Sequence, residues 1–315
     1  MPASPTTYPL GAPTISGSTV TVDELLNNPS RIDRDIMDLA AQRLYMDRVF
    51  TAAGGVEGGA LIFERSNNAA IDLYGDREPK EVSPGTEFPE QTFQRGVPMM
   101  AKPRKIGNKF FVTKEAKKRN NPRTLAKDIR RAANTIARRV ELMGLAELAA
   151  VVTAESRFRT GTSWATYAGL TAANRTYTTG PVADVMAALL QADTEERGVE
   201  FDSIIMHTDE ALKVKQAFPE QTLQQVFSMA NDATGEGNQR GIRNVFVTNR
   251  HAAGVATVFE AGNVGEWRNE FPFESESEWE GPAAGGRQRW VYQWSISPLF
   301  AVDNQFAVLE IRGIA

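Results

Sequence analysis

Apolar residues recur every three to four positions along residues 122–152 and predict one helix of about 30 residues. At 1.5 Å per residue, such a helix is about 45 Å long. Asn121 suits the N-cap and Pro122 suits the first helical position. Gly144 in the helix interior costs about 1 kcal/mol, which is too little to end the helix. The apolar stripe consists of Leu125, Ile129, Ala132, Ile136, Val140, Met143 and Leu148.

Shorter patterns flank this long helix. Met1–Pro29 is rich in Pro, Thr, Ser and Gly and predicts an extended arm, and a helix at 29–50 follows it. The stretch Thr51–Gly59, with four glycines, should end that helix and act as a hinge. Beyond Pro181 helices alternate with apolar strands, which predicts a mixed α/β layer. Its expected helices are 182–196 and 209–218, its strands are 201–207, 245–248 and 255–259, and 231–241 is a polar loop.

Strict alternation marks a β-hairpin near the end of the chain. Phe273–Glu280 places four glutamates on one face, and Arg287–Ile296 returns after a Gly- and Pro-rich tip. A symmetric register pairs Glu280 with Arg287, Glu278 with Arg289 and Phe273 with Trp294. A last strand is expected at 306–311.

A long β projection is expected between two further strands, Ala60–Glu64 and Lys109–Thr113. More than forty residues punctuated by Gly and Pro separate them. Segments of this kind are usually functional or ordered by a partner. Because an isolated hairpin is barely stable in water, the projection should lie on another surface.

Charge is distributed very unevenly. The run Lys102–Arg139 contains 14 Lys/Arg and two acids, so it carries +12 in a chain of net charge −4, and the remainder carries about −16. Three interpretations stay open for this run: a solvated face, a contact with the acidic part of another copy, or a contact with nucleic-acid phosphates.

Two parts of the basic run are treated separately. For the first part we favour contacts between subunits, in which basic residues meet the glutamate ladder of a neighbour. Those basic residues are Lys102, Arg104, Lys105 and Lys109, and the ladder is Glu274, Glu276, Glu278 and Glu280. For Arg130, Arg131, Arg138 and Arg139 contacts with DNA and with neighbouring subunits both stay open.

Several function classes find little support. The chain has no cysteine, which excludes disulfides, thiolate metal sites and cysteine nucleophiles. No signal peptide, membrane span, phosphate-binding glycine loop or hydrolase motif is recognised, so we expect no enzyme activity, no cofactor, no metal and no membrane association. His207 precedes Asp209 and Glu210, and these residues are better explained as one histidine followed by helix-capping acids than as a metal site. A hydrolase using Glu276 and Glu278 is the alternative from another class, because their strand spacing fits an inverting carboxylate pair.

The order of these parts resembles the major capsid proteins of tailed phages, the Hong Kong 97-like fold. The resemblance rests on Val97–Glu115 running into the long helix, on Phe201–Leu212 and on the closing Trp290–Gly313 segment. In detail it is most similar to capsid proteins of siphophages that infect actinobacteria. It implies an α+β fold with an N-terminal arm, an extended β-hairpin loop, a long spine helix, a peripheral domain and an α/β axial domain.

The resemblance also implies a division of the chain. The arm and short helix would be 1–53 and the extended loop 54–113. The peripheral domain would be 114–153 with 267–299, and the axial domain 154–266 with 300–315.

The function implied is a head protein that self-assembles into hexamers and pentamers of an icosahedral shell around double-stranded DNA, bound without regard to sequence. Assembly would occur in the host cytoplasm with separate scaffolding and portal proteins, and the loop would reorient during maturation. Some relatives join a loop lysine to an asparagine of another subunit, for which Lys80 with Asn269 or Asn304 are weak candidates. The nearest alternative is an encapsulin-like nanocompartment shell protein.

Overall fold

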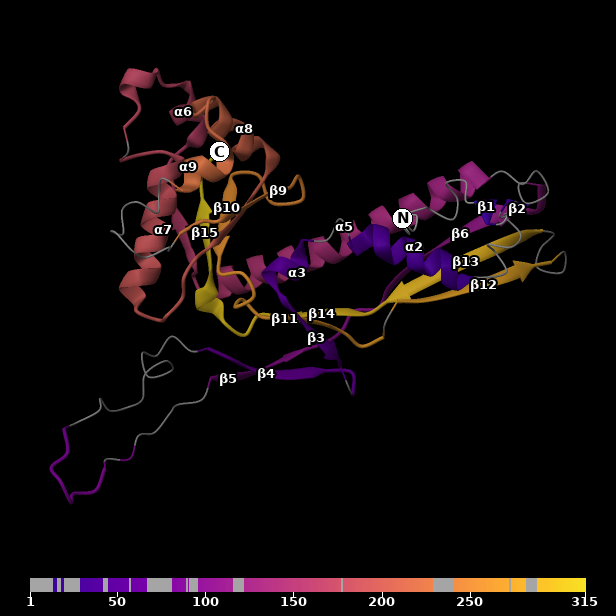
Figure 1. The fold of residues 1–315 in the computed structure, drawn as a ribbon, viewed down its shortest axis with the longest axis horizontal. Helices are drawn as coiled ribbons and strands as arrows, with labels where there is room; N and C mark the ends of the chain where they lie inside the picture. Colours follow the sequence, from indigo (N-terminus) through magenta and orange to yellow (C-terminus); the bar gives the residue numbers. More distant parts are fainter. Residues whose placement is uncertain are drawn as a thin grey trace.

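The computed structural model describes residues 14–15, 18–19, 29–41, 45–56, 58–66, 81–88, 90, 96–115, 122–176, 178–228, 241–271, 273–281 and 288–315. A long helix runs along the molecule, with an α/β lobe at one end and a β-hairpin sheet at the other (Figure 1). A two-stranded projection leaves the body near the middle of this axis. Of the predicted arm before Pro29, the structure describes the short strand pair β1 (Thr14–Ile15) and β2 (Ser18–Thr19), and the rest lies outside the described residues.

Helix α5 (Pro122–Ala154) confirms the predicted long helix, and all seven residues of its apolar stripe are buried or partly buried. Asn121 lies outside the described residues. Helix α2 (Pro29–Ala41) packs against α5 through Ile32 and Ile36, which are fully buried.

The predicted single helix at 29–50 is wrong, because α2 ends at Ala41 and the separate helix α3 (Met46–Val49) follows. Gly144 explains how α3 packs. A Cβ at this position would lie 2.6 Å from the Met46 sulfur, so the glycine makes room for Met46 against the long helix.

The α/β lobe is built on a five-stranded sheet in the order β7-β15-β10-β8-β9. The predicted helices and strands are confirmed to within a few residues, while the expected loop 231–241 lies almost wholly outside the described residues. The sheet unites the last strand of the chain with the lobe. Its strands are β7 (Phe158–Thr160), β8 (Ser203–Met206), β9 (Asn244–Val247), β10 (Val255–Phe259) and β15 (Val308–Arg312), with helices α6 (Trp164–Gly169), α7 (Pro181–Glu195), α8 (Thr208–Ala217) and α9 (Leu223–Ser228) and 3-10 turns at Ala172–Asn174 and Gln305–Ala307.

A small sheet in the middle of the molecule was not predicted. Strand β3 (Thr51–Gly55) runs parallel to β11 (Glu266–Asn269), which pairs antiparallel with β14 (Pro298–Ala301). The glycine-rich stretch therefore begins as a strand, and Gly54 and Gly55 belong to it. The turn lies at Gly58 and Gly59, which have φ of +79° and +73°.

The hairpin sheet at the far end consists of β12 (Glu274–Glu280), β13 (Arg289–Ile296) and β6 (Ile106–Thr113). The hairpin is confirmed, but its predicted register is wrong by two residues. Glu280 faces Arg289 and Glu278 faces Val291, while Arg287 lies outside the described residues. Because side chains alternate with a period of two, a shift of two residues leaves each side chain on its predicted face.

The projection is built differently from the prediction. Strand β4 (Leu61–Arg65) pairs with β5 (Val97–Ala101), not with Lys109–Thr113. The latter residues belong to β6 and pair with β13 along its whole length. Among the described residues, no helix is both long and apolar enough to cross a membrane.

Candidate assembly surfaces

The glutamate ladder lies on the outward face of the hairpin sheet. Glu274, Glu276 and Glu278 are exposed, whereas Glu280 is partly buried and its carboxylate accepts a hydrogen bond from Arg289 Nε at 2.6 Å. Glu276 Oε2 accepts from the Gln293 side chain at 2.8 Å. These are ordinary cross-strand pairs, and the sheet places the ladder on an open surface.

Two of the basic residues assigned to subunit contacts lie beside this ladder in the same chain. The sheet register aligns Glu276, Gln293 and Lys109 in one row across three strands. Lys105 and Lys109 line a groove of about 480 Å³ with Glu274 and Glu276. Lys105, Lys109 and part of the ladder therefore lie on one face of the same subunit, and this face carries both signs of charge.

The opposite face of the hairpin sheet holds it against the body. The Tyr292 hydroxyl donates to the Asp33 carboxylate of α2. Burial, together with this hydrogen bond, raises the pKa of Tyr292. Tyr292 also packs on the Phe110 ring, with centroids 4.9 Å apart. The sheet is thus fixed to α2, and its charged face is turned outward.

Lys102 and Arg104 lie in a different environment from Lys105 and Lys109. They border a second groove, of about 300 Å³, between α5 and the root of the projection, which is the strand pair β4 and β5. Its apolar lining comes from both elements and from β14: Phe63, Met99, Met100, Ala101, Met143, Leu299 and Phe300, with Arg65, Glu147 and Pro298. The residues of the basic run therefore lie on two separate surfaces.

The root of the projection is fixed to the body by Arg65, which is only 8% exposed. Its Nε donates to the Val302 carbonyl at 3.1 Å, and its guanidinium lies 3.8 Å from the Glu155 carboxylate at the end of α5. The next amide, of Ser66, donates to the Asp303 carbonyl at 2.9 Å. No motif in the sequence distinguished Arg65 from other arginines.

One face of β4 and β5 packs on the middle sheet. Leu61, Phe63 and Ala101 contact a small buried cluster that contains Val56 and Leu299. The other face is open and apolar: Ile62 is 75% exposed and its cross-strand neighbour Met100 is 59% exposed. A large exposed apolar pair on a projecting hairpin is typical of a surface that a partner covers.

The four spine-helix arginines lie on one exposed face of α5. Arg130, Arg131, Arg138 and Arg139 are all exposed, and the Arg131 side chain is 78% exposed although it pairs with Asp128. The two pairs are eight residues apart, which is about 12 Å along a helix. The helix therefore presents a basic strip that can contact a polyanion or another subunit.

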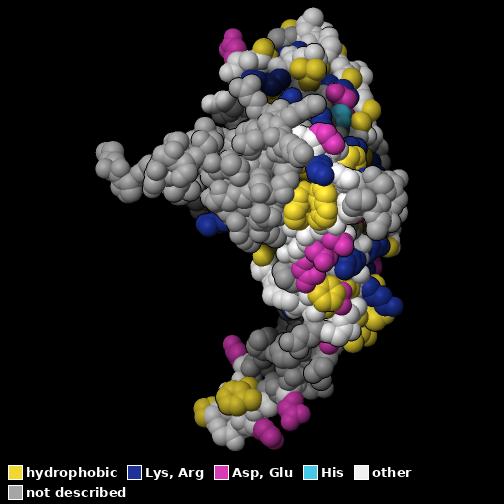
Figure 2. Space-filling model, turned by 90° about the vertical axis from the view of Figure 1, so that its right-hand side faces the viewer, with side chains coloured by type: hydrophobic (Ala, Val, Ile, Leu, Met, Phe, Trp, Pro, Cys, Tyr) yellow, Lys and Arg dark blue, Asp and Glu magenta, His cyan; other side chains and the backbone are white. Residues whose placement is uncertain are grey.

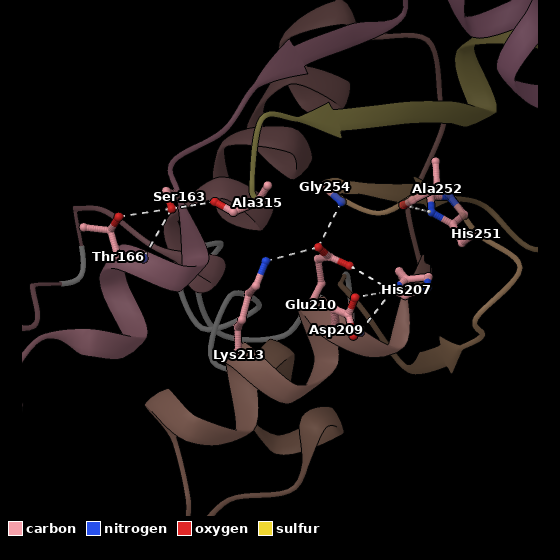
Figure 3. Close-up of polar contacts among 10 residues, drawn as sticks. All are labelled: Ser163, Thr166, His207, Asp209, Glu210, Lys213, His251, Ala252, Gly254 and Ala315. Carbon is pink, nitrogen blue, oxygen red and sulfur yellow. Dashed lines mark hydrogen bonds and ion pairs between the residues drawn. The ribbon is translucent and has the colours of Figure 1, made fainter.

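The apex of the α/β lobe contains the histidines (Figure 3). His207 Nδ1 accepts from the Asp209 amide at 3.1 Å, so this ring caps α8, a role that the sequence analysis gave to the acids after it. Glu210 is 1% exposed and its carboxylate accepts from the Gly254 amide at 2.9 Å, with Lys213 at 3.4 Å. Burial lowers the pKa of His251.

Within the described residues, no group of three or more His, Asp or Glu is arranged to hold a metal. The contacts of the apex instead join α8 to the turn before β10. Ser163 extends this framework, because its hydroxyl donates to the Ala315 carbonyl at 2.6 Å and accepts from the Thr166 amide at 3.2 Å (Figure 3). The cluster is a structural one.

The asparagines considered for a covalent cross-link have structural positions. The backbone carbonyl of Asn269 accepts from the Val56 amide, and the side chain of Asn304 caps a 3-10 turn by accepting from the Phe306 amide at 3.1 Å. Lys80 lies outside the described residues. Cross-linking therefore remains an untested hypothesis.

Comparison with solved structures defines the fold. The subunit of a virus-like particle from Pyrococcus furiosus superposes with a TM-score of 0.56 at 11% identity, covering 90% of this chain and 98% of the other. The capsid of cyanophage P-SCSP1u gives 0.56 at 14% identity, covering 85% and 88%. Microbacterium phage Oxtober96 gives 0.53 at 8% identity, covering 83% and 88%. At such identities the likeness establishes the fold, which is that of viral shell proteins.

The sequence itself gives the family. The profile of a family described as phage capsid protein matches residues 96–311, which is about two thirds of the chain. None of the curated proteins matches the sequence. This chain therefore belongs to the phage capsid protein family. It is a structural protein, the major capsid protein of a bacteriophage, and its copies build an icosahedral capsid.

Proposed function

We propose that the chain assembles into hexamers and pentamers of a shell that encloses double-stranded phage DNA. The observation that carries this proposal is the projection. Its strands β4 and β5 bury one face on the body and leave Ile62 and Met100 open, so a second surface must cover them. A shell of identical subunits supplies that surface in every copy.

The basic strip of α5 supports DNA contacts in this proposal. Arg130, Arg131, Arg138 and Arg139 stand out from one helix face, and such contacts with phosphates need no sequence recognition. Replacing these four arginines with glutamine should leave the shell intact and reduce the DNA retained at moderate salt. A shell that loses its ability to assemble instead would assign the strip to subunit contacts.

The four divisions of the chain remain part of the proposal, with one refinement. Residues 106–113 are hydrogen-bonded to β13 and move with the hairpin sheet, so the extended loop is better bounded at Lys105. Reorientation of the loop during maturation is also proposed, now around Gly58 and Gly59. Equal protease resistance of residues 66–100 before and after shell expansion would refute it.

Assembly in the host cytoplasm with separate scaffolding and portal proteins completes the proposal. The decisive experiment is expression of the chain alone and with its neighbouring genes, followed by negative-stain electron microscopy and extraction of nuclease-protected nucleic acid. Shells that protect DNA when packaging genes are present support the proposal. Shells that contain only a protein cargo would favour the nanocompartment alternative, and small oligomers alone would refute both.

A further inference from the structure

The far end of the projection carries an ordered turn with an exposed aromatic residue. The Ser83 carbonyl accepts hydrogen bonds from the Thr86 amide at 3.1 Å and from the Thr86 hydroxyl. Pro84 and Gly85 occupy the two central positions, and Gly85 has a φ of +89°. These are the residue types and the backbone sign that a type II turn requires. The turn is therefore closed by hydrogen bonds within its own four residues.

Phe88 follows this turn and is 80% exposed, which is the highest exposure of any large apolar side chain among the described residues. Acidic residues surround it: residues 81–94 include Glu81, Glu87 and Glu90 and no Lys or Arg. Figure 2 shows acidic and hydrophobic side chains together at this end of the molecule. Aromatic side chains are enriched at protein interfaces, so an exposed one beside a turn is a candidate anchor.

The groove at the root of the projection has the complementary chemistry. It is lined by Phe63, Met99 and Met143, and Lys102 and Arg104 border it. Its volume of about 300 Å³ is ample for a phenyl ring, since a cavity of roughly 150 Å³ accepts benzene. Methionine side chains adapt readily to an inserted aromatic ring.

The other groove fits this turn less well. That groove, on the hairpin sheet, contains Glu274 and Glu276 beside Lys105 and Lys109, so an acidic segment would meet like charges there. The root groove has Arg65, Lys102 and Arg104 against the single acid Glu147. Charge therefore distinguishes between the two grooves and favours the one at the root.

We propose that the turn Ser83–Phe88 of one subunit docks into the root groove of a second copy, with the Phe88 ring inserted and Glu87 and Glu90 facing Lys102 and Arg104. Figure 1 shows the turn at the far end of the projection, away from α5 and from strands β4 and β5, whose side chains line the groove, so we place the contact between two copies. The inference rests on the proposed shell function and names the contact that the projection makes there. It assigns Lys102 and Arg104 to the turn of a neighbour, in place of the glutamate ladder.

Truncation of the anchor is the first test. Phe88→Ala should raise the protein concentration needed for half-maximal assembly by about 30-fold, the effect expected when an interface anchor is lost. Phe88→Leu should lie between this variant and the wild type. Leu190→Ala, which truncates an apolar side chain that is 64% exposed on α7, is the matched control. Equal assembly of Phe88→Ala and wild type would overturn the proposal.

Cross-linking gives the second test, because the chain has no cysteine of its own. Glu87→Cys combined with Met100→Cys should form covalent dimers and larger oligomers when assembled shells are oxidised, since a disulfide needs Cα atoms within about 7 Å. Glu87→Cys combined with Gln293→Cys probes the other groove and should form no covalent dimers or larger oligomers. Cross-linking at 293 and none at 100 would overturn the proposal.

A charge exchange completes the design. Lys102→Glu should impair assembly, and the added change Glu87→Lys should restore it. Failure of the wild-type chain to form shells would refute the proposed function. Normal wild-type shells with no rescue and no cross-link at 100 would refute only this docking contact.

Discussion

Replacement of Arg65 tests whether the projection is held to the body at its root. In Arg65→Ala the hydrogen bond from a charged donor to the Val302 carbonyl is lost, which typically contributes about 1.5–3 kcal/mol. The ion pair with Glu155 adds less than about 1 kcal/mol, because that carboxylate is 29% exposed. Strands β4 and β5 form only a two-stranded sheet, which is marginal without such anchors. We expect the projection to open locally about 2–3 kcal/mol more easily.

Hydrogen exchange of unassembled subunits measures this opening directly. Backbone amides of β4 and β5 should exchange about 30- to 150-fold faster in Arg65→Ala than in wild type, because each 1.4 kcal/mol is a factor of ten. Amides of α5 and of the lobe should be unchanged. Arg65→Lys keeps the charge but lacks the Nε donor, so its exchange should be intermediate. Arg131→Ala, at an exposed site, is the control, and equal exchange in this variant and in Arg65→Ala would refute the reasoning.

Three further variants test other parts of the structure. Gly265→Ala should destabilise the fold by several kcal/mol in denaturant titration, because its Cβ would lie about 2.0 Å from the Ala301 carbonyl oxygen. Tyr292→Phe should cost about 1–3 kcal/mol in the same assay, because the partly buried hydrogen bond to the Asp33 carboxylate is lost. His251→Gln should flatten the pH dependence of stability below about pH 6.5. The pKa of His251 is lowered by burial, so wild-type stability falls as pH drops through the unfolded value toward the folded one.

A specific result would contradict each of these three expectations. A Gly265→Ala variant as stable as wild type would show that the backbone can yield at β14. Unchanged stability of Tyr292→Phe would mean that the hairpin sheet is held by packing alone. For His251, subtracting the variant's curve of stability against pH from the wild-type curve leaves the contribution of this residue and removes those of Asp303 and Glu310. Burial raises the pKa of both acids, and their contributions fall as pH rises.

The sequence by itself determined the elements whose pattern is local. The stripe from Leu125 to Leu148 specified the long helix, because one periodicity held over many turns. Alternation in Phe273–Glu280 specified the faces of the hairpin sheet, and the alternating segments after Pro181 specified the α/β lobe. The charge of 102–139 identified a basic surface. The order of these parts was sufficient to indicate the family.

Tertiary structure alone decided the strand pairing of the middle sheet. Strands β3, β11 and β14 have only four or five residues each, and β3 joins β11 from more than 200 positions away, so local pattern carries no signal for them. The hairpin register differed by two, with Glu280 opposite Arg289, and β13 is also held along its whole length by β6 on its other side. No composition or periodicity specifies that choice.

Tertiary structure also divided the basic run between two surfaces. The chain leaves β5 at Ala101 and enters β6 at Ile106, and in that short passage Lys102 and Arg104 border one groove while Lys105 and Lys109 border another. In the sequence analysis these residues were treated as one basic run, because net charge is summed over neighbouring positions in the chain. Which partner each residue can reach depends on the direction of the backbone, and that direction is fixed by hydrogen bonds to strands nearly 200 residues further along.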